Sequence, residues 1–336
     1  MPPIRTAAQR LGIHMHTVRA AYHHLEEMGY VSSRPGSGTT VLPYQLFSRK
    51  VEIPLSAGMK VGVILPELDS FHSQVLAGME RVLREEGFSL LLEIIGFDPP
   101  SAERSLDRLR QQGVQGVLNV TTGFSSGFIS KLGKNELNLS LPILFVNGPS
   151  SPCAGVQVDI ASVAYQAAVH LADHGHSSMG LINVPQDWYF GEAIYRGFME
   201  GLRARSAGTG QLFIRTVTRL DAEAGYDAAL QFSHSALKPS AIFAASDRLA
   251  AGAVQAIVEQ ELRIPEDVAI IACNDSDLAK FTQPGITAFN LHGEETGYQA
   301  GQLMIRCLRS KEAGAPENII FPVDLIKRSS CGCEAD

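Results

Sequence analysis

The sequence predicts an α/β protein with two Rossmann-like lobes, preceded by a small and incomplete winged helix-turn-helix. Two observations lead to this fold class. Short apolar segments alternate with amphipathic helices from residue 60 onward, and the first 42 residues follow a helix, turn, helix, hairpin pattern. The 336 residues are enough for two or three folding units.

Residues 1–42 form the first predicted unit. Thr6 is expected to cap a short helix, AAQRL, which Gly12 ends. A second helix is expected from His16 to Gly29. Its apolar residues recur every three or four positions and so share one buried face: Val18, Tyr22, Leu25 and Met28.

A hairpin should complete this unit. The segment YVSSRPGSGTTVL predicts strands over 30–32 and 39–42, joined by the turn 35–38. Residues 43–59 have mixed polarity and contain two prolines, so they are expected to form a linker.

The remaining residues, 60–336, alternate strand and helix, which requires a parallel sheet covered on both faces. About ten evenly alternating strand-helix units are too many for one compact sheet. Two Rossmann-like lobes, each with its own sheet, are the simpler arrangement. We expect lobe 1 at about 60–160 and 290–326, with IIFPVDL as its last strand, and lobe 2 at about 161–289.

Charge is distributed unevenly along the chain. The net charge is −7, yet residues 1–50 carry +4, which leaves −11 for the rest. A basic head on an acidic body is typical of a protein whose one end meets DNA, although chance clustering in a short segment is the alternative. No apolar run is long enough to span a membrane, and the N-terminus lacks a signal-peptide pattern, so a cytoplasmic protein is expected. Five scattered cysteines give no disulfide framework.

The head resembles the GntR family over about 40 residues, carried by PPIRTAAQRLGIHMHTVRAAYHHLEEMGYVSSRPGSGTTV. In a helix-turn-helix, the N-terminal residues of the second helix reach the major groove. The resemblance implies these DNA contacts: Arg5, His16, Thr17, Arg19, Arg34, Gly36 and Thr39. His14 and Met15 stand where that family usually has Ser-Arg. The family's first helix has no counterpart before residue 1, so the head is expected to be incomplete.

The body resembles the effector domain of the LacI/GalR family, which shares the fold of periplasmic sugar-binding proteins. The resemblance is carried by KVGVILPELDSFHSQVLAGMERVLREEGF, PSAIFAASDRLAAGAVQAI and IPEDVAIIACND, among other segments. It implies a small molecule held between the lobes and a homodimer formed through the body.

Polar residues follow the predicted strands at several points. Ligands of open α/β sheets lie beyond the carboxyl ends of the strands. The residues expected to bind the effector are Asp69, Phe71, His72, Asp159, Trp188, Tyr189, Asp247 and Asn274. Each aspartate taken alone is as well explained as a helix N-cap. Ile194 stands where the family commonly has a ligand-clamping Arg, and Asn274 where it has Asp. An ordinary sugar is therefore in doubt, and Trp188, Tyr189 or Arg248 is an alternative clamp.

No metal or other cofactor is expected. His170, His174 and His176 have helical spacing but no acidic fourth partner, and Cys331 and Cys333 form an isolated pair near the chain end. The sequence also contains no nucleophile elbow, P-loop or dinucleotide fingerprint, so an enzyme is not expected.

These observations predict a DNA-binding transcription regulator, most simply a repressor, controlled by a small molecule that is carbohydrate-like or a related polar metabolite. The alternative is a ligand-binding module whose vestigial head no longer binds DNA. A periplasmic solute receptor is weakened by the missing signal sequence and by the attached head.

Overall fold

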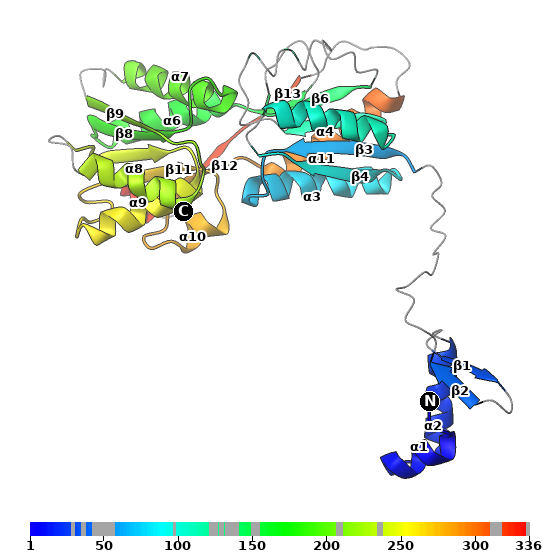
Figure 1. Ribbon diagram of the computed structural model, residues 1–336. Helices are drawn as coiled ribbons and strands as arrows, with labels where there is room; N and C mark the ends of the chain where they lie inside the picture. Colours follow the sequence, from blue (N-terminus) through cyan, green and yellow to red (C-terminus); the bar gives the residue numbers. More distant parts are fainter. Residues whose placement is uncertain are drawn as a thin grey trace. The chain divides into compact units, whose positions relative to one another are not determined.

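The computed structural model describes residues 1–27, 31–34, 38–41, 58–96, 99–120, 127, 131, 141–148, 155–205, 211–233, 238–309 and 318–333. The chain divides into two units, Met1–Gly58 and Met59–Asp336. Each unit is described by itself below (Figure 1).

In the first unit, two helices precede an antiparallel hairpin. The helices are α1 (Ile4–Leu11) and α2 (Met15–Glu27), and the hairpin strands are β1 (Val31–Arg34) and β2 (Gly38–Val41). The small core consists of Ala7, Ala8, Val18 and Tyr22. Burial of Val18 and Tyr22 confirms the predicted apolar face for these two residues. Met28 lies outside the described residues.

The ends of α1 confirm one expectation and correct another. Gly12 ends the helix in the left-handed conformation, with φ 65°, as predicted. Thr6 is not the N-cap, because α1 begins at Ile4 and Pro3 precedes it without a side-chain cap bond. The φ of Pro3 is −55°, a value that its ring fixes and that already suits the start of a helix.

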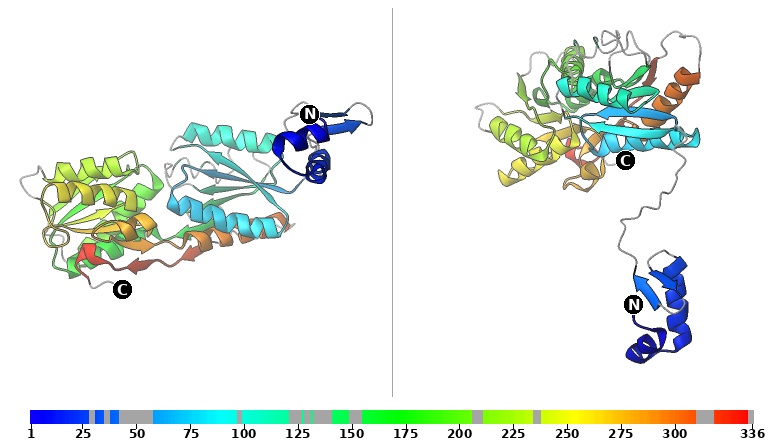
Figure 2. Two further views of the ribbon diagram at one scale, coloured as in Figure 1. Left: turned by 90° about the horizontal axis from the view of Figure 1, so that it is seen from below. Right: turned by 45° about the vertical axis from the view of Figure 1, so that its right-hand side comes forward.

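The first lobe of the second unit contains a six-stranded parallel sheet in the order β13-β7-β6-β5-β3-β4. Its strands are β3 (Lys60–Leu65), β4 (Ser89–Ile94), β5 (Gly116–Val120), β6 (Ile143–Val146), β7 (Gly155–Val158) and β13 (Asn318–Phe321). The helices α3 (Ser70–Glu85) and α11 (Gly293–Arg309) pack together on one face, and α4 (Pro99–Gln111) covers the other (Figure 2).

The sequence of β3 explains why both faces of this sheet are covered. Val61, Val63 and Leu65 belong to the core under α3 and α11, whereas Ile64 packs with Leu106 of α4. Successive side chains of a strand point to opposite faces, so a strand that is buried on both sides appears as a continuous apolar run.

The second lobe has a six-stranded sheet in the order β14-β12-β11-β10-β8-β9, in which only β14 is antiparallel. Its strands are β8 (Ser178–Asn183), β9 (Gln211–Thr216), β10 (Ala241–Ala244), β11 (Ala269–Cys273), β12 (Thr287–Asn290) and β14 (Asp324–Ile326). Helices α6 (Ile160–Asp173) and α7 (Tyr189–Ala204) pack as one pair, and α8 (Ala222–Ser233) and α9 (Asp247–Glu259) as another. The short elements α10 (Asp277–Phe281) and η2 (Ser329–Cys331) complete the lobe.

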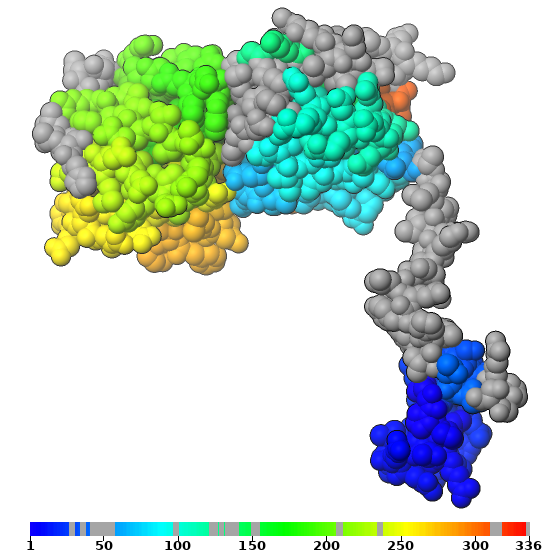
Figure 3. Space-filling view, viewed as in Figure 1, coloured from blue at the N-terminus to red at the C-terminus, as the bar shows by residue number. Residues whose placement is uncertain are grey.

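The chain passes between the lobes after β7, after β12 and after β13, and the lobes meet side by side (Figure 3). The two predicted lobes are therefore found, but the stretch IIFPVDL is not one strand of lobe 1. Its first part is β13 in lobe 1, and its second part is β14 in lobe 2. Pro322 separates the two parts, since it has no N–H to donate to a ladder. Within the described residues, no helix is long and apolar enough to cross a membrane.

Candidate functional site

Polar side chains from both lobes line a cleft between them, with a volume of about 260 Å³. Lobe 1 contributes the start of α3, and lobe 2 contributes the loops after β10 and β11. The side chains that the argument uses are Asp69, Phe71, Asp247, Arg248, Asn274 and Ser276. Four predicted effector residues are therefore brought together here, from positions up to 205 residues apart: Asp69, Phe71, Asp247 and Asn274.

Asp69 lies at the N-terminus of α3 and is held there by His72. Its Oδ1 accepts the His72 backbone N–H at 2.7 Å and lies 2.7 Å from the His72 Nδ1. Burial acts to raise the pKa of Asp69, but the hydrogen bonds and the charge of His72 outweigh it and leave that pKa below its ordinary value. Asp69 therefore presents an ionised carboxylate. His72 is 3% exposed and does not line the cleft, so its observed contact is with Asp69.

Asp247 begins α9 on the opposite side of the cleft and is only 4% exposed. Its Oδ1 accepts the backbone N–H of Arg248 at 2.8 Å. Burial raises the pKa of Asp247, the hydrogen bonds from Ser276 and Arg248 oppose this, and the charge of Asp69 raises it further. Because the Asp247 carboxylate is shielded from water, leaving it without a strong hydrogen-bond donor costs free energy. A bound hydroxyl or amine would supply one.

Arg248 links the two lobes directly across the cleft. Its Nη1 lies 3.2 Å from the Glu67 Oε2, and both side chains are about two-thirds buried or more. The sequence analysis suggested Arg248 as an alternative residue to clamp the ligand. It did not identify Glu67 or Ser276 as cleft residues. Glu67 follows β3 by two residues, so the strand-end rule that identified Asp69 also covers it.

Asn274 occupies a left-handed backbone position, with φ 73°, directly after β11. Asparagine tolerates this conformation better than most residues. The neighbouring Asp275 is committed elsewhere, because its Oδ1 lies 2.6 Å from the Arg328 Nη2. The amide of Asn274 is thus the polar group that this strand end brings to the cleft.

The other predicted effector residues lie apart from this cleft. Asp159 is exposed and caps α6, accepting the Ser162 backbone N–H at 2.9 Å. Trp188 is the N-cap residue of α7 and packs against the main core. Tyr189 packs against the α4-side core of lobe 1, and burial raises its pKa. Tyr189 is thus a contact between lobes.

The thiol beside the cleft should be chemically inert in the folded protein. Cys273 is fully buried, and burial raises its pKa to about 12. A thiolate is the reactive form, so at pH 8 Cys273 should resist iodoacetamide in native protein and react once urea unfolds the chain. Peptide mass mapping before and after urea measures this. Rapid native labelling at Cys273 would contradict the buried geometry.

Four of the predicted DNA-contacting residues are exposed on the two helices of the first unit. Arg5 is exposed on α1, and His16, Thr17 and Arg19 are exposed in the first turns of α2, around the buried Val18. Thr39 is half-buried, and its Oγ1 lies 3.0 Å from the Ser33 Oγ within the hairpin. The side chain of Arg34 and the whole of Gly36 lie outside the described residues.

Comparison with known proteins supports the effector domain. Residues 168–331 match a family described as periplasmic binding protein-like domain. The chain is 24% identical to the HTH-type transcriptional repressor PurR of Mannheimia succiniciproducens, over 84% of this chain and 83% of that protein. It is 27% identical to the ribose operon repressor of Escherichia coli, over 72% and 73%. A crystal structure of a LacI family transcriptional regulator from Enterococcus faecium with bound ribose matches with a TM-score of 0.71 and 24% identity, over 81% and 98%.

The two-lobed α/β unit is similar to the periplasmic-binding-protein-like class, and the two relatives named above are transcriptional repressors. The resemblance of the body to that class is confirmed. The GntR resemblance of the head has no support among these relatives, which are regulators of LacI and PurR type.

Proposed function

We propose that this chain represses transcription by binding operator DNA through residues 1–42 and that a small molecule bound between the lobes controls this binding. The observation that carries the proposal is the cleft, where Asp69 and Asp247 face each other from different lobes. A ligand that bridges them favours one arrangement of the lobes, and a change in lobe arrangement is the means by which a ligand shifts an equilibrium at a distance. We expect a homodimer in the cytoplasm.

The chemistry of the cleft indicates the class of effector. Its polar groups are mainly acceptors, with Arg248 already paired to Glu67. Carboxylates and an amide oxygen accept hydrogen bonds from hydroxyl and amine groups, and their negative charge repels anions. We therefore propose a neutral or cationic metabolite with several hydroxyl or amine donors. Ile194 is 0% exposed and provides no clamp for a carboxylate or phosphate.

We infer a winged helix-turn-helix head, and the antiparallel hairpin of β1 and β2 that follows α2 supports this inference. Glu26 of α2 holds this hairpin, accepting the Ser33 backbone N–H at 2.6 Å. We propose that α2 enters the major groove with His16, Thr17 and Arg19 toward the bases and phosphates. Arg5, Thr39 and the hairpin residues Arg34 and Gly36 are proposed to contact the backbone.

Selection from a random DNA pool tests the DNA-binding part of this proposal. The full chain should enrich a sequence with two related half-sites, because a symmetric dimer presents two heads. Absence of enrichment above the starting pool, at low salt and with or without ribose, would leave only the alternative of a ligand-binding module.

Replacing Arg19 by alanine should weaken DNA binding and reduce its salt dependence. Loss of one phosphate contact lowers the slope of log K against log salt by about 1. Fluorescence anisotropy of a labelled duplex over a series of KCl concentrations measures both quantities. Arg84→Ala, which removes an exposed arginine of α3, is the matched control and should bind like the unaltered chain. Identical slopes for Arg19→Ala and the unaltered chain would exclude Arg19 from the interface.

A further inference from the structure

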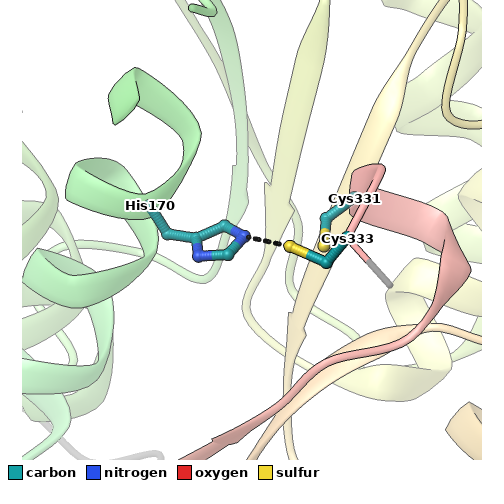
Figure 4. Close-up of side chains that lie close together, drawn as sticks. All are labelled: His170, Cys331 and Cys333. Atoms are coloured by element: carbon teal, nitrogen blue, oxygen red, sulfur yellow. Dashed lines mark hydrogen bonds between the residues drawn. The ribbon is translucent and has the colours of Figure 1, made fainter. Parts of the chain in front are cut away.

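Two groups of residues that the proposed function does not use meet in the second lobe. His170 and His174 lie at the end of α6, and Cys331 and Cys333 lie near the end of the described chain. The donor atoms of His170, Cys331 and Cys333 are all within 4.8 Å of one another. The Cys333 Sγ is 3.5 Å from the His170 Nε2 and 3.2 Å from the His174 Nε2. Figure 4 shows the His170 ring directed at the Cys333 sulfur, with Cys331 beside it.

The helix fixes the direction of both imidazoles. Residues four apart share one face of a helix, and the two rings stack with their centroids 4.3 Å apart. The His174 Nδ1 lies 2.8 Å from the His170 carbonyl oxygen, which can only accept, so Nδ1 carries the proton. The Nε2 of His174 is then the unprotonated nitrogen facing Cys333. Histidines that bind metals are oriented by the same kind of second hydrogen bond.

The segment that contains Cys331 and Cys333 is also held in a fixed position. Ser330, which precedes Cys331, is fully buried, and its hydroxyl donates to the Ile270 carbonyl at 2.6 Å. Cys331 is 2% exposed, and Gly332 follows it with φ 81°, a left-handed turn that glycine adopts without strain. This turn brings Cys333 back beside Cys331, so that both sulfurs lie on the side facing α6 (Figure 4).

We propose that His170, His174, Cys331 and Cys333 bind one Zn²⁺ ion as a closed structural site. Two imidazoles and two thiolates are a preferred donor set for tetrahedral Zn²⁺, whereas Mg²⁺ and Ca²⁺ require oxygen donors. Zn–S and Zn–N bonds of about 2.3 and 2.0 Å at tetrahedral angles place sulfur and nitrogen about 3.5 Å apart. The two S···N separations in the structure, 3.5 and 3.2 Å, already have about this value.

Binding involves a simple exchange of protons. Each thiol loses its proton as its sulfur coordinates Zn²⁺, so two protons pass to the buffer for each ion bound. The imidazoles bind in their neutral form.

The ion would join the last turn of α6 to a segment about 160 residues later in the chain. This segment follows β14 and the third passage between the lobes. Both partners belong to lobe 2, so the expected effect is greater stability of that lobe rather than a change in ligand specificity. The inference does not depend on the proposed function.

The test uses the full chain, purified with a phosphine reductant, stripped with EDTA and loaded with Zn²⁺. Elemental analysis after gel filtration should find one zinc per chain, and Zn²⁺ should raise the melting temperature by about 5 °C. Co²⁺ in place of Zn²⁺ should give the absorption of tetrahedral thiolate coordination. Cys333→Ser and His174→Ala should each weaken Zn²⁺ binding at least about 100-fold in competition with a chromophoric chelator.

Cys307→Ser is the control variant, since Cys307 lies on α11 in the other lobe, and it should bind Zn²⁺ like the unaltered chain. Circular dichroism of the stripped variants verifies that they fold, because both substituted side chains are at least partly exposed. Either of two results would overturn the proposal: no zinc retained after gel filtration, or zinc retained with equal affinity by Cys333→Ser.

Discussion

Replacing Asp247 by asparagine is expected to weaken effector binding by roughly 10- to 150-fold, the value of one hydrogen bond to a charged group. The same change should stabilise the empty protein at neutral pH. Asp247 is nearly fully buried, faces the charge of Asp69 and has a raised pKa. Its ionisation in the folded state is therefore unfavourable until a donor from the ligand compensates for it. Binding sites commonly contain residues that lower the stability of the ligand-free protein, because those residues are arranged for the ligand.

The pH dependence has a definite sign. Because folding raises the pKa of Asp247, its contribution to stability is complete below the unfolded pKa and is lost as pH rises through the folded value. Asp247→Asn should therefore gain stability relative to the unaltered chain as pH rises from 4.5 to about 7.5. Urea unfolding at several pH values measures this. Asp107→Asn, on the exposed face of α4, is the control and should show no such trend. A variant that binds effector normally would remove Asp247 from the site.

Replacing Gly297 by alanine is expected to destabilise the effector domain by about 3 kcal/mol, a large value for adding one methyl group. A Cβ at this position would lie 1.9 Å from the Val75 carbonyl oxygen, and the next nearest atoms also belong to the backbone of Val75. Gly78 makes the reciprocal approach to the Glu294 carbonyl oxygen, at the same 1.9 Å. The two glycines allow α3 and α11 to pack backbone to backbone, and neither backbone moves without disturbing the sheet below.

Thermal unfolding measures this effect, which corresponds to a fall in melting temperature of about 5–10 °C. The higher helix propensity of alanine offsets only about 1 kcal/mol of the cost. Glu295→Ala, two residues earlier on the exposed side of α11, should change stability by less than about 0.5 kcal/mol. Equal stability of Gly297→Ala and Glu295→Ala would show that the two helices pack less closely than described.

Much of the fold follows from local pattern. The two lobes, the left-handed end of α1 at Gly12 and the buried positions Val18 and Tyr22 were all predicted, because periodicity and helix-ending signals depend on neighbouring residues. The errors have local causes as well. Pro3, rather than Thr6, precedes α1, and Pro322 divides an apolar stretch between two sheets. In the second case the sequence contained the signal, since a proline interrupts a strand.

The candidate site was only partly predictable. The strand-end rule identified Asp69, Asp247 and Asn274, because the edge at which parallel strands end follows from topology alone. It did not distinguish them from Asp159, which also follows a strand and caps a helix, as Asp69 does, but does not line the cleft. The pairing of Arg248 with Glu67 joins residues 181 positions apart. The meeting of His170 with Cys333 spans 163 positions, and no local pattern carries such information.

The most direct test of the proposed function is titration of the chain's selected DNA complex with small molecules, followed by anisotropy. The panel starts with ribose and continues with other pentoses, hexoses, polyols, nucleosides and amino acids. At least one neutral or cationic polyhydroxy or amino compound should change the DNA affinity at least about fivefold, as expected for a coupling free energy of 1 kcal/mol or more. In the Asp247→Asn variant, the same response should require a higher concentration of that compound. A compound that binds the effector domain at the cleft but leaves DNA affinity unchanged would contradict the coupling of cleft and head.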